Sequence, residues 1–186
     1  MPDTSSTVPT VLVLLADGFE EIEAFAPIDL LRRAGVEVTV ASLNENRHAT
    51  GRSNVVAHAD VALSAVGDRL FDLLFLPGGA GVKLLRADPR VRQAVDQHHA
   101  AGRWLAAICA APTVLNDSGL LSGRKYTAHF SVANELHAIR ADERIVTDGK
   151  VTTSRGAGTA VEFGLHLVAL LVSPAKSSEI SKAICF

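Results

Sequence analysis

Cys109 has the most evident capacity for covalent chemistry in this sequence, because of the residues on either side of it. An apolar strand candidate, Leu105 to Ile108, leads into the cysteine, and Ala110, Ala111 and Pro112 follow it. Small residues and a helix-starting proline predict a sharp turn from strand to helix, the geometry that exposes a nucleophile. A thiol near a helix N-terminus is expected to have a lowered pKa and to react as a thiolate. The alternative is a buried structural cysteine, since free cysteine is among the most buried residue types.

Three glutamates, Glu20, Glu21 and Glu23, lie just after the first strand candidate and open a predicted helix. A solvated acidic first turn, favoured by the helix dipole, is a sufficient explanation of Glu20 and Glu21. Glu23 differs because Pro27 lacks the N–H that would bond its carbonyl, which predicts a kink beside it. If Glu23 points toward the ligand-binding edge of the sheet, desolvation should raise its pKa and make it a proton donor and acceptor for the thiol.

A glycine-rich stretch, Pro77 to Gly81, follows another apolar strand candidate. The backbone N–H of Gly79, together with that of Ala110, could form an oxyanion hole over the cysteine. The spacing is not G-x-G-x-x-G, and Gly149-Lys150 lacks the upstream glycine and following hydroxyl residue of a phosphate loop, so we expect no nucleotide cofactor. A plain turn is the alternative interpretation of both stretches.

His129 is singled out among the seven histidines because it follows a short β-like run that begins at Tyr126. Such a residue could orient or protonate a substrate beside the thiolate, and an ordinary surface or core histidine is the alternative. His98 and His99 are adjacent on a predicted helix and face different ways. No histidine pair has the i, i+4 spacing of a helical metal site, so we expect no metal.

Short β-rich runs alternate with helical patterns along the chain, which favours an α/β architecture. The predicted strands are Thr10 to Leu15, Glu37 to Ser42, Val55 to His58, Leu73 to Leu76, Leu105 to Ile108, Ile145 to Asp148 and Val151 to Ser154. The predicted helices are Phe19 to Ala34, Lys83 to Leu85, Pro89 to Ala101, Pro112 to Asp117, His129 to Glu135 and Gly158 to Leu171, and Ser173 onward forms a short C-terminal helix or arm. Nearly unbroken apolar strands indicate a mostly parallel sheet covered on both faces, and Asp148-Gly149 predicts one antiparallel hairpin. Ligands of such open sheets gather at the carboxyl ends of the strands.

Composition and charge exclude several classes of protein. The chain has 186 residues, 48% of them hydrophobic and 20% charged, and a formal net charge of −2, which suits a single globular domain and provides no electrostatic footprint for nucleic acid or anionic membrane. Its apolar stretches are too short for a membrane span. Residues 1–9 are polar without an apolar core, so we expect a disordered arm and not a signal peptide, with one domain over residues 10–186. The two cysteines, Cys109 and Cys185, indicate a reducing compartment, and we expect a cytoplasmic protein.

Five stretches together resemble the ThiJ/PfpI superfamily, and within it the branch of the parkinsonism-associated protein deglycase. They are Ala16 to Glu23, Leu31 to Gly35, Leu76 to Gly79, Ala107 to Thr113 and Thr153 to Thr159. One departure is Ala111, where this branch often has glycine. The resemblance implies a flavodoxin-like, class I glutaminase-like sandwich that is usually a homodimer. It also implies a reactive cysteine at Cys109, a proton-sharing glutamate at Glu23, a nearby histidine at His129 and backbone donors at Gly79 and Ala110.

The activities implied by the resemblance are a glutathione-independent glyoxalase reaction, from methylglyoxal to lactate, and deglycation of early glyoxal adducts. In that interpretation the thiolate of Cys109 attacks a small 2-oxoaldehyde or a glycated substrate, and Glu23 moves protons with help from His129. The competing interpretation is a redox sensor with chaperone-like behaviour, in which Cys109 becomes a sulfinate and no turnover is needed.

Other branches of the superfamily fit this sequence less well. A PfpI-type protease has a histidine directly after the cysteine, where this chain has Ala110. A class I glutaminase requires a late His-x-Glu, which none of the histidines provides. The thiazole monophosphate biosynthesis label attached to the ThiJ name finds no phosphate loop here.

Overall fold

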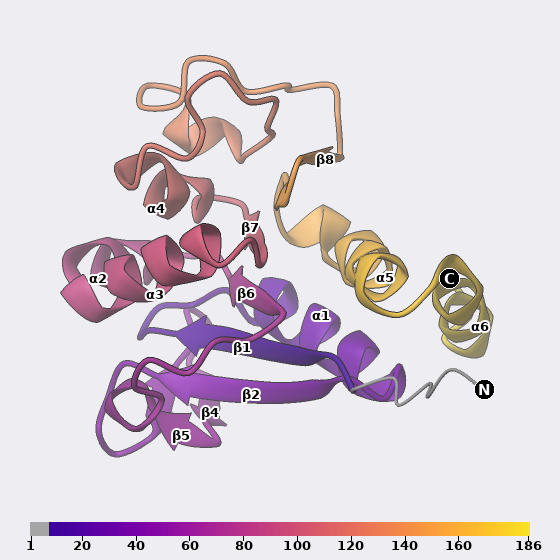
Figure 1. Cartoon of the computed structure of the whole chain (residues 1–186), viewed down its shortest axis with the longest axis horizontal. Helices are drawn as coiled ribbons and strands as arrows, with labels where there is room; N and C mark the ends of the chain where they lie inside the picture. Colours follow the sequence, from indigo (N-terminus) through magenta and orange to yellow (C-terminus); the bar gives the residue numbers. More distant parts are fainter. Residues whose placement is uncertain (1–7) are drawn as a thin grey trace.

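The computed structural model of the chain describes residues 8–186 and consists of one mixed sheet between two layers of helices (Figure 1). The strands are β1 (Thr10–Leu15), β2 (Glu37–Ser42), β3 (His48–Thr50), β4 (Val56–His58), β5 (Val61–Ala62), β6 (Leu73–Leu76), β7 (Trp104–Ile108), β8 (Ile145–Asp148) and β9 (Val151–Ser154). The helices are α1 (Glu21–Arg33), α2 (Val82–Ala87), α3 (Pro89–Ala100), α4 (Pro112–Asp117), α5 (Ala160–Leu171) and α6 (Pro174–Ala183). The disordered arm expected over residues 1–9 falls mainly on residues 1–7, which lie outside the described residues, and the single domain over residues 10–186 stays a prediction.

Seven strands form the main sheet in the order β5-β2-β1-β6-β7-β9-β8. All neighbours run parallel except β8 and β9, which form the antiparallel hairpin that Asp148-Gly149 predicted. The mostly parallel flavodoxin-like α/β fold is therefore confirmed. From β1 the chain adds β2 on one side and later β6 on the other, so the order of strands reverses between β1 and β6, where open α/β sheets form a crevice for ligands.

The sheet is buried on both faces because its central strands are apolar at nearly every position. Val11, Val13 and Leu15 of β1 pack into a core with α1, α5 and α6. Leu12 and Leu14 point to the opposite face and pack into a second core with α2, α3 and α4. This alternation explains why a continuous apolar run predicts a strand in a sheet that is buried on both faces.

The structure differs from the predicted elements in several places. The hairpin of β3 and β4 forms a separate small sheet of which only β4 was expected, and the two-residue β5 was not predicted. Helix α1 begins at Glu21 and not at Phe19, because Phe19 pairs with Gly79 in an isolated bridge. The helix expected over His129 to Glu135 is wrong: the segment forms only a 3-10 turn, η2 (Phe130–Val132), since the extended backbone of His129 is held by Cys109.

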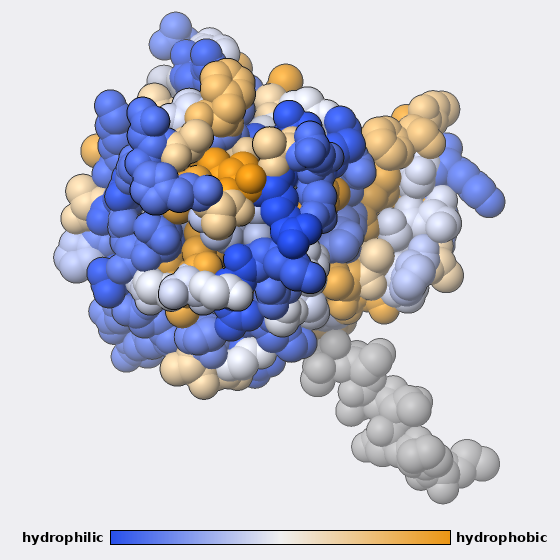
Figure 2. Space-filling view, turned by 90° about the horizontal axis from the view of Figure 1, so that it is seen from above, coloured by the Kyte–Doolittle hydropathy of each residue, from blue (hydrophilic) through white to orange (hydrophobic). Residues whose placement is uncertain are grey.

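The surface seen from the side of the loops after α4 is mostly hydrophilic (Figure 2). Apolar side chains show in a hollow near the middle of this view and along the flank that carries α6. No helix in the part of the chain that the structure describes is both long and apolar enough to cross a membrane.

Candidate active site

Three segments meet at the crevice where the strand order reverses. The turn after β1 leads into α1, the Pro77 to Gly81 turn follows β6, and Cys109 follows β7. The first two turns are joined by backbone hydrogen bonds, from the Glu20 N–H to the Gly78 carbonyl at 3.0 Å and from the Gly81 N–H to the Gly18 carbonyl at 2.9 Å. Residues distant in sequence are thereby fixed at one edge of the sheet.

Cys109 lies on the sharp turn that the sequence predicted, and its backbone is in the left-handed region with φ of 66°. Few residues other than glycine adopt this conformation, and it costs about 1–3 kcal/mol. Two long-range hydrogen bonds hold it: the Cys109 N–H donates to the Ser154 carbonyl, and the Cys109 carbonyl accepts from the His129 N–H, both at 2.9 Å. The elbow is thus fixed by neighbouring segments, and Ala111 is accommodated at φ of −63°.

Glu23 lies in the first turn of α1 with only 1% of its surface exposed. Glu20 caps this helix by accepting the Glu23 N–H at 2.8 Å. The Glu23 carboxyl accepts the Gly78 N–H at 3.1 Å and is hydrogen-bonded to the Cys109 thiol. The structure therefore brings Glu23 and Cys109 into contact, as expected, and leaves Glu20 at the rim of the cleft.

Glycines make this contact possible, because side chains would occupy the space that the pair needs. A β-carbon at Gly78 would lie 2.4 Å from Glu23 Oε2 and 2.6 Å from Cys109 Cβ. A β-carbon at Gly156 would lie 3.5 Å from His129, 3.6 Å from Glu23 Oε1 and 3.9 Å from Cys109 Sγ. Gly156 therefore faces all three of the predicted side chains.

The Glu23–Cys109 pair has shifted pKa values, and here the expectation for the thiol is wrong. Burial is the main cause that raises the pKa of Glu23 to about 7, as predicted. Burial and the adjacent Glu23 charge raise the pKa of Cys109 to about 12, where the sequence suggested a lowered value. Hydrogen bonds from the N–H groups of Gly79 and Ala110 lower the pKa of Cys109, as expected, but burial and the Glu23 charge outweigh them. Helix α4 begins only at Pro112, so its N-terminus is not directly at the thiol.

The consequence is one shared proton between about pH 7 and about pH 12. In this range the pair carries a single negative charge, which lies mainly on the Glu23 carboxylate because its pKa is the lower of the two. A thiolate beside a protonated carboxyl forms when Glu23 takes the proton of the Cys109 thiol. The Gly79 and Ala110 N–H groups point at the sulfur, so an oxygen formed on a carbon bound there has donors within reach.

His129 lines the same cleft, with its ring oriented by its neighbours. Its Nδ1 accepts the Ser131 N–H at 3.2 Å and lies 2.8 Å from the Ser131 hydroxyl. Since Nδ1 is an acceptor, neutral His129 carries its proton on Nε2. His129 is therefore placed to donate a proton within the cleft.

The cleft over Cys109 has a volume of about 780 Å³, within the range of small-molecule sites. Its wall includes all five predicted site residues, and it also includes residues that sequence reasoning missed. The predicted lining residues are Glu23, Gly79, Cys109, Ala110 and His129, and the charged additions are Arg52, Lys83, Arg86 and Glu135. Within residues 8–186, no three His, Cys, Asp or Glu side chains gather in a way that could hold a metal ion.

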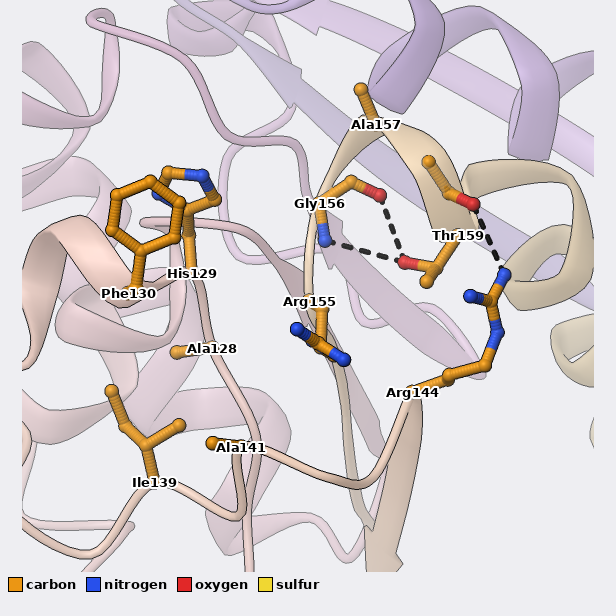
Figure 3. A pocket seen from close by; sticks show the side chains of 11 residues that line it. Ala128, His129, Phe130, Ile139, Ala141, Arg144, Arg155, Gly156, Ala157 and Thr159 are labelled. Atoms are coloured by element: carbon orange, nitrogen blue, oxygen red, sulfur yellow. Dashed lines mark hydrogen bonds between the residues drawn. The ribbon is translucent and has the colours of Figure 1, made fainter.

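A second cavity of about 450 Å³ lies beside this cleft and shares His129 and Ala157 with it (Figure 3). Gly156 belongs to the lining of this second cavity. The Thr159 hydroxyl accepts the Gly156 N–H at 3.2 Å and donates to the Gly156 carbonyl at 2.8 Å, which fixes the turn before α5. The signal for this turn was the Gly156-Ala157-Gly158-Thr159 run, and its proximity to Cys109 required the pairing of β7 with β9.

The model of the DJ-1/PfpI family matches residues 9–170. The chain belongs to the DJ-1/PfpI family. Protein dj-1beta of Drosophila melanogaster is 37% identical over 94% of this chain and 96% of that protein. The glutathione-independent glyoxalase DJR-1.2 of Caenorhabditis elegans is 33% identical over 94% of this chain and 95% of that protein.

Solved structures of DJ-1/PfpI proteins share the whole fold. The crystal structure of Drosophila melanogaster DJ-1beta superposes with a TM-score of 0.92 at 37% identity, covering 96% of this chain and 98% of that one. Oxidized Toxoplasma gondii DJ-1 superposes with a TM-score of 0.91 at 34% identity, covering 96% and 99%. The resemblance identified from five short stretches is therefore confirmed at the level of the DJ-1/PfpI family.

Proposed function

We propose that this protein is a glutathione-independent glyoxalase that converts 2-oxoaldehydes such as methylglyoxal to hydroxy acids such as lactate, and that also acts on their early adducts. The observation that carries the proposal is the hydrogen-bonded pair of buried Glu23 and half-buried Cys109, which both line a cleft of about 780 Å³, with two backbone N–H groups directed at the sulfur. A relative that covers almost the whole chain is named as a glyoxalase of this kind.

The first step uses the thiolate form of the pair. Cys109 Sγ attacks the aldehyde carbon, and the aldehyde oxygen becomes an oxyanion that the Gly79 and Ala110 N–H groups stabilise. The proton held by Glu23 then moves to this oxygen. The product is a neutral hemithioacetal beside a Glu23 carboxylate.

The next steps move a proton between two carbons. The Glu23 carboxylate removes the hydrogen of the former aldehyde carbon, which gives an enediol, and a proton returns to the neighbouring carbon to give a thioester of lactate. His129 is the second donor, since its Nε2 carries a proton. Water then hydrolyses the thioester and restores the thiol, so methylglyoxal plus water gives lactate with no external oxidant or reductant.

The deciding experiment measures lactate formed from methylglyoxal without glutathione and with a chelator present. We expect turnover in the wild type, its loss in Cys109→Ala, and a fall of about 10²-fold to 10⁴-fold in kcat/KM in Glu23→Gln. Cys185→Ser is the matched control, because Cys185 is exposed and lies outside the lining of the cleft. Full activity in Cys109→Ala, or no turnover in a folded wild type, would disprove the proposal.

A second candidate function is a redox sensor that uses the same cysteine. The carboxyl of Glu23 beside Cys109 could hydrogen-bond to a cysteine sulfinate, and a structural relative is described as oxidized. Peroxide titration followed by mass spectrometry tests it: a sensor forms a stable Cys109 sulfinate at doses that leave Cys185 unmodified. Oxidation of Cys185 first would argue against a sensor.

We also propose a homodimer formed through an apolar patch on α1, the loop before β4 and the first residue of β4. Large apolar side chains are exposed there, with Ile22 at 54%, Val55 at 48% and Val56 at 60%. Arg52 N–H donates to the Phe19 carbonyl at 2.9 Å, so this loop and the start of α1 form one surface. Light scattering of the wild type should give twice the mass of one chain. The Ile22→Glu variant should give the mass of a single chain. A wild type that is monomeric at micromolar concentration would contradict this proposal.

A further inference from the structure

The second cavity, defined above beside His129, lies within reach of a molecule bound at Cys109. Its lining includes Gly156, whose β-carbon position is 3.9 Å from Cys109 Sγ. Gly156, His129 and Ala157 therefore border both this cavity and the space around the reacting sulfur. A substrate longer than methylglyoxal can place its reactive carbon at Cys109 and extend into the cavity.

The cavity has a positively charged lining with no acidic side chain among its lining residues. Arg144 is occupied, because it pairs with Glu162 at 2.6 Å and donates to the Gly158 carbonyl at 3.1 Å. Arg155 makes no ion pair or side-chain hydrogen bond with any residue of the described range 8–186. In Figure 3 its guanidinium lies between His129 and Phe130 on one side and Arg144 on the other. Arg155 is therefore the cation available to a ligand.

The remaining wall is apolar, with Ala128, Ile139 and Ala141 beside Phe130. The Phe130 side chain is 80% exposed, and its ring centroid lies 4.0 Å from that of His129. An apolar wall with one free guanidinium suits a short carbon chain that ends in an anion, because Arg binds carboxylates through paired N–H donors.

We propose that this cavity binds the carboxylate of substrates that carry one, with Arg155 as its partner, so that the enzyme prefers 2-oxoaldehydes with a terminal carboxylate to their uncharged analogues. The inference rests on the proposed function and specifies its substrate class. Arg155 is a specificity-determining residue in this proposal, since it contacts the substrate away from the reacting carbon.

The test compares two substrates of the same shape, 4,5-dioxopentanoate and its uncharged amide, with the wild-type protein. The readout is the ratio of their kcat/KM values, so a general loss of activity in a variant cancels. We expect a ratio of about ten in the wild type, typical of one partly exposed charge-assisted pair, and a ratio near one in Arg155→Gln. Arg155→Lys should keep part of the preference, and added salt should reduce it in the wild type.

Arg92→Gln is the matched control, because Arg92 is an exposed arginine on α3 whose ion pair is with Asp96 of the same helix. It should leave the ratio unchanged. A wild-type ratio near one, or a ratio retained in Arg155→Gln, would overturn the inference.

A failure of the proposed function can be distinguished from a failure of this inference. If the wild type does not convert methylglyoxal, calorimetric binding of the two compounds to Cys109→Ala still decides the question. Tighter binding of the carboxylate by about tenfold, lost when Arg155→Gln is added, supports the cavity assignment without turnover. Equal binding of the two compounds overturns it.

Discussion

The carboxyl of Glu23 and the thiol of Cys109 form a hydrogen-bonded pair in which burial raises the pKa of both groups. Because the two groups come from α1 and the end of β7, the pair exists only when the sheet and its helical layer are assembled. Its protonation state connects the structure to the pH dependence of the proposed reaction.

The first prediction is an acidic limit to activity. The reactive form is the pair with one proton, and its first proton leaves near the Glu23 pKa of about 7. We therefore expect kcat/KM to rise with pH through this value and to fall about tenfold per pH unit well below it. Alkylation of Cys109 by iodoacetamide in a Cys185→Ser background should follow the same curve. A flat profile across this range would contradict the shared-proton description.

The second prediction is that stability falls as pH rises, whereas activity rises over the same range. Glu23 has a folded-state pKa raised from 4.5 to about 7, so the folded wild type loses stability as pH rises from the lower value to the higher one. Glu23→Gln removes this penalty, and we expect it to be about 3 kcal/mol more stable than the wild type above this window. Urea denaturation on both sides of the window measures the difference. Equal pH dependence of the two proteins would be inconsistent with a buried, ionising Glu23.

The third prediction is that Gly78→Ala impairs activity more than stability. The new β-carbon would meet Glu23 Oε2 at 2.4 Å and Cys109 Cβ at 2.6 Å, so the pair must separate. Misplacement on this scale can cost about 10²-fold in kcat/KM. Gly119→Ala is the control, because it has a φ of 73° but no atom within 4 Å of the new carbon. The control should lose about 1 kcal/mol of stability and keep its activity, whereas an active Gly78→Ala would show that the contact is dispensable.

The fourth prediction tests the packing that positions α1. A β-carbon at Gly164 of α5 would lie 2.7 Å from Leu30 Cδ1 and 2.9 Å from Pro27 Cα. The proline backbone cannot move without displacing the helix that carries Glu23, so we expect Gly164→Ala to cost about 1–3 kcal/mol. Helix propensity alone predicts a gain of about 1 kcal/mol. The sign of the change in chemical denaturation therefore decides between the two effects.

Sequence reasoning located the main strands and the candidate site because each depends on local patterns. The bounds of β1 and β2 agree with their apolar runs, and the turn at Cys109 was evident from its small neighbours and Pro112. Family resemblance favoured the proposed roles of Glu23 and His129 over the alternatives that local patterns left open.

What sequence reasoning missed depends on contacts between distant segments. The strand β3 is three residues long and lacks a periodic pattern, and the helix expected at His129 is prevented by a hydrogen bond to Cys109. The raised pKa of Cys109 follows from burial and from the Glu23 charge, neither of which a turn motif reveals. Gly156 becomes part of the site only through the pairing of β9 with β7.

The two backbone hydrogen bonds that hold Cys109, with Ser154 and with His129, have a consequence for folding during biosynthesis. A nascent chain that has emerged only as far as α4 already contains Cys109, Glu23 and the glycine turn, but it lacks both partners of the strained elbow. The nucleophile can reach its reactive geometry only after β9 has docked against β7. The sheet must therefore be complete before the elbow forms, and an incomplete chain does not present the assembled site.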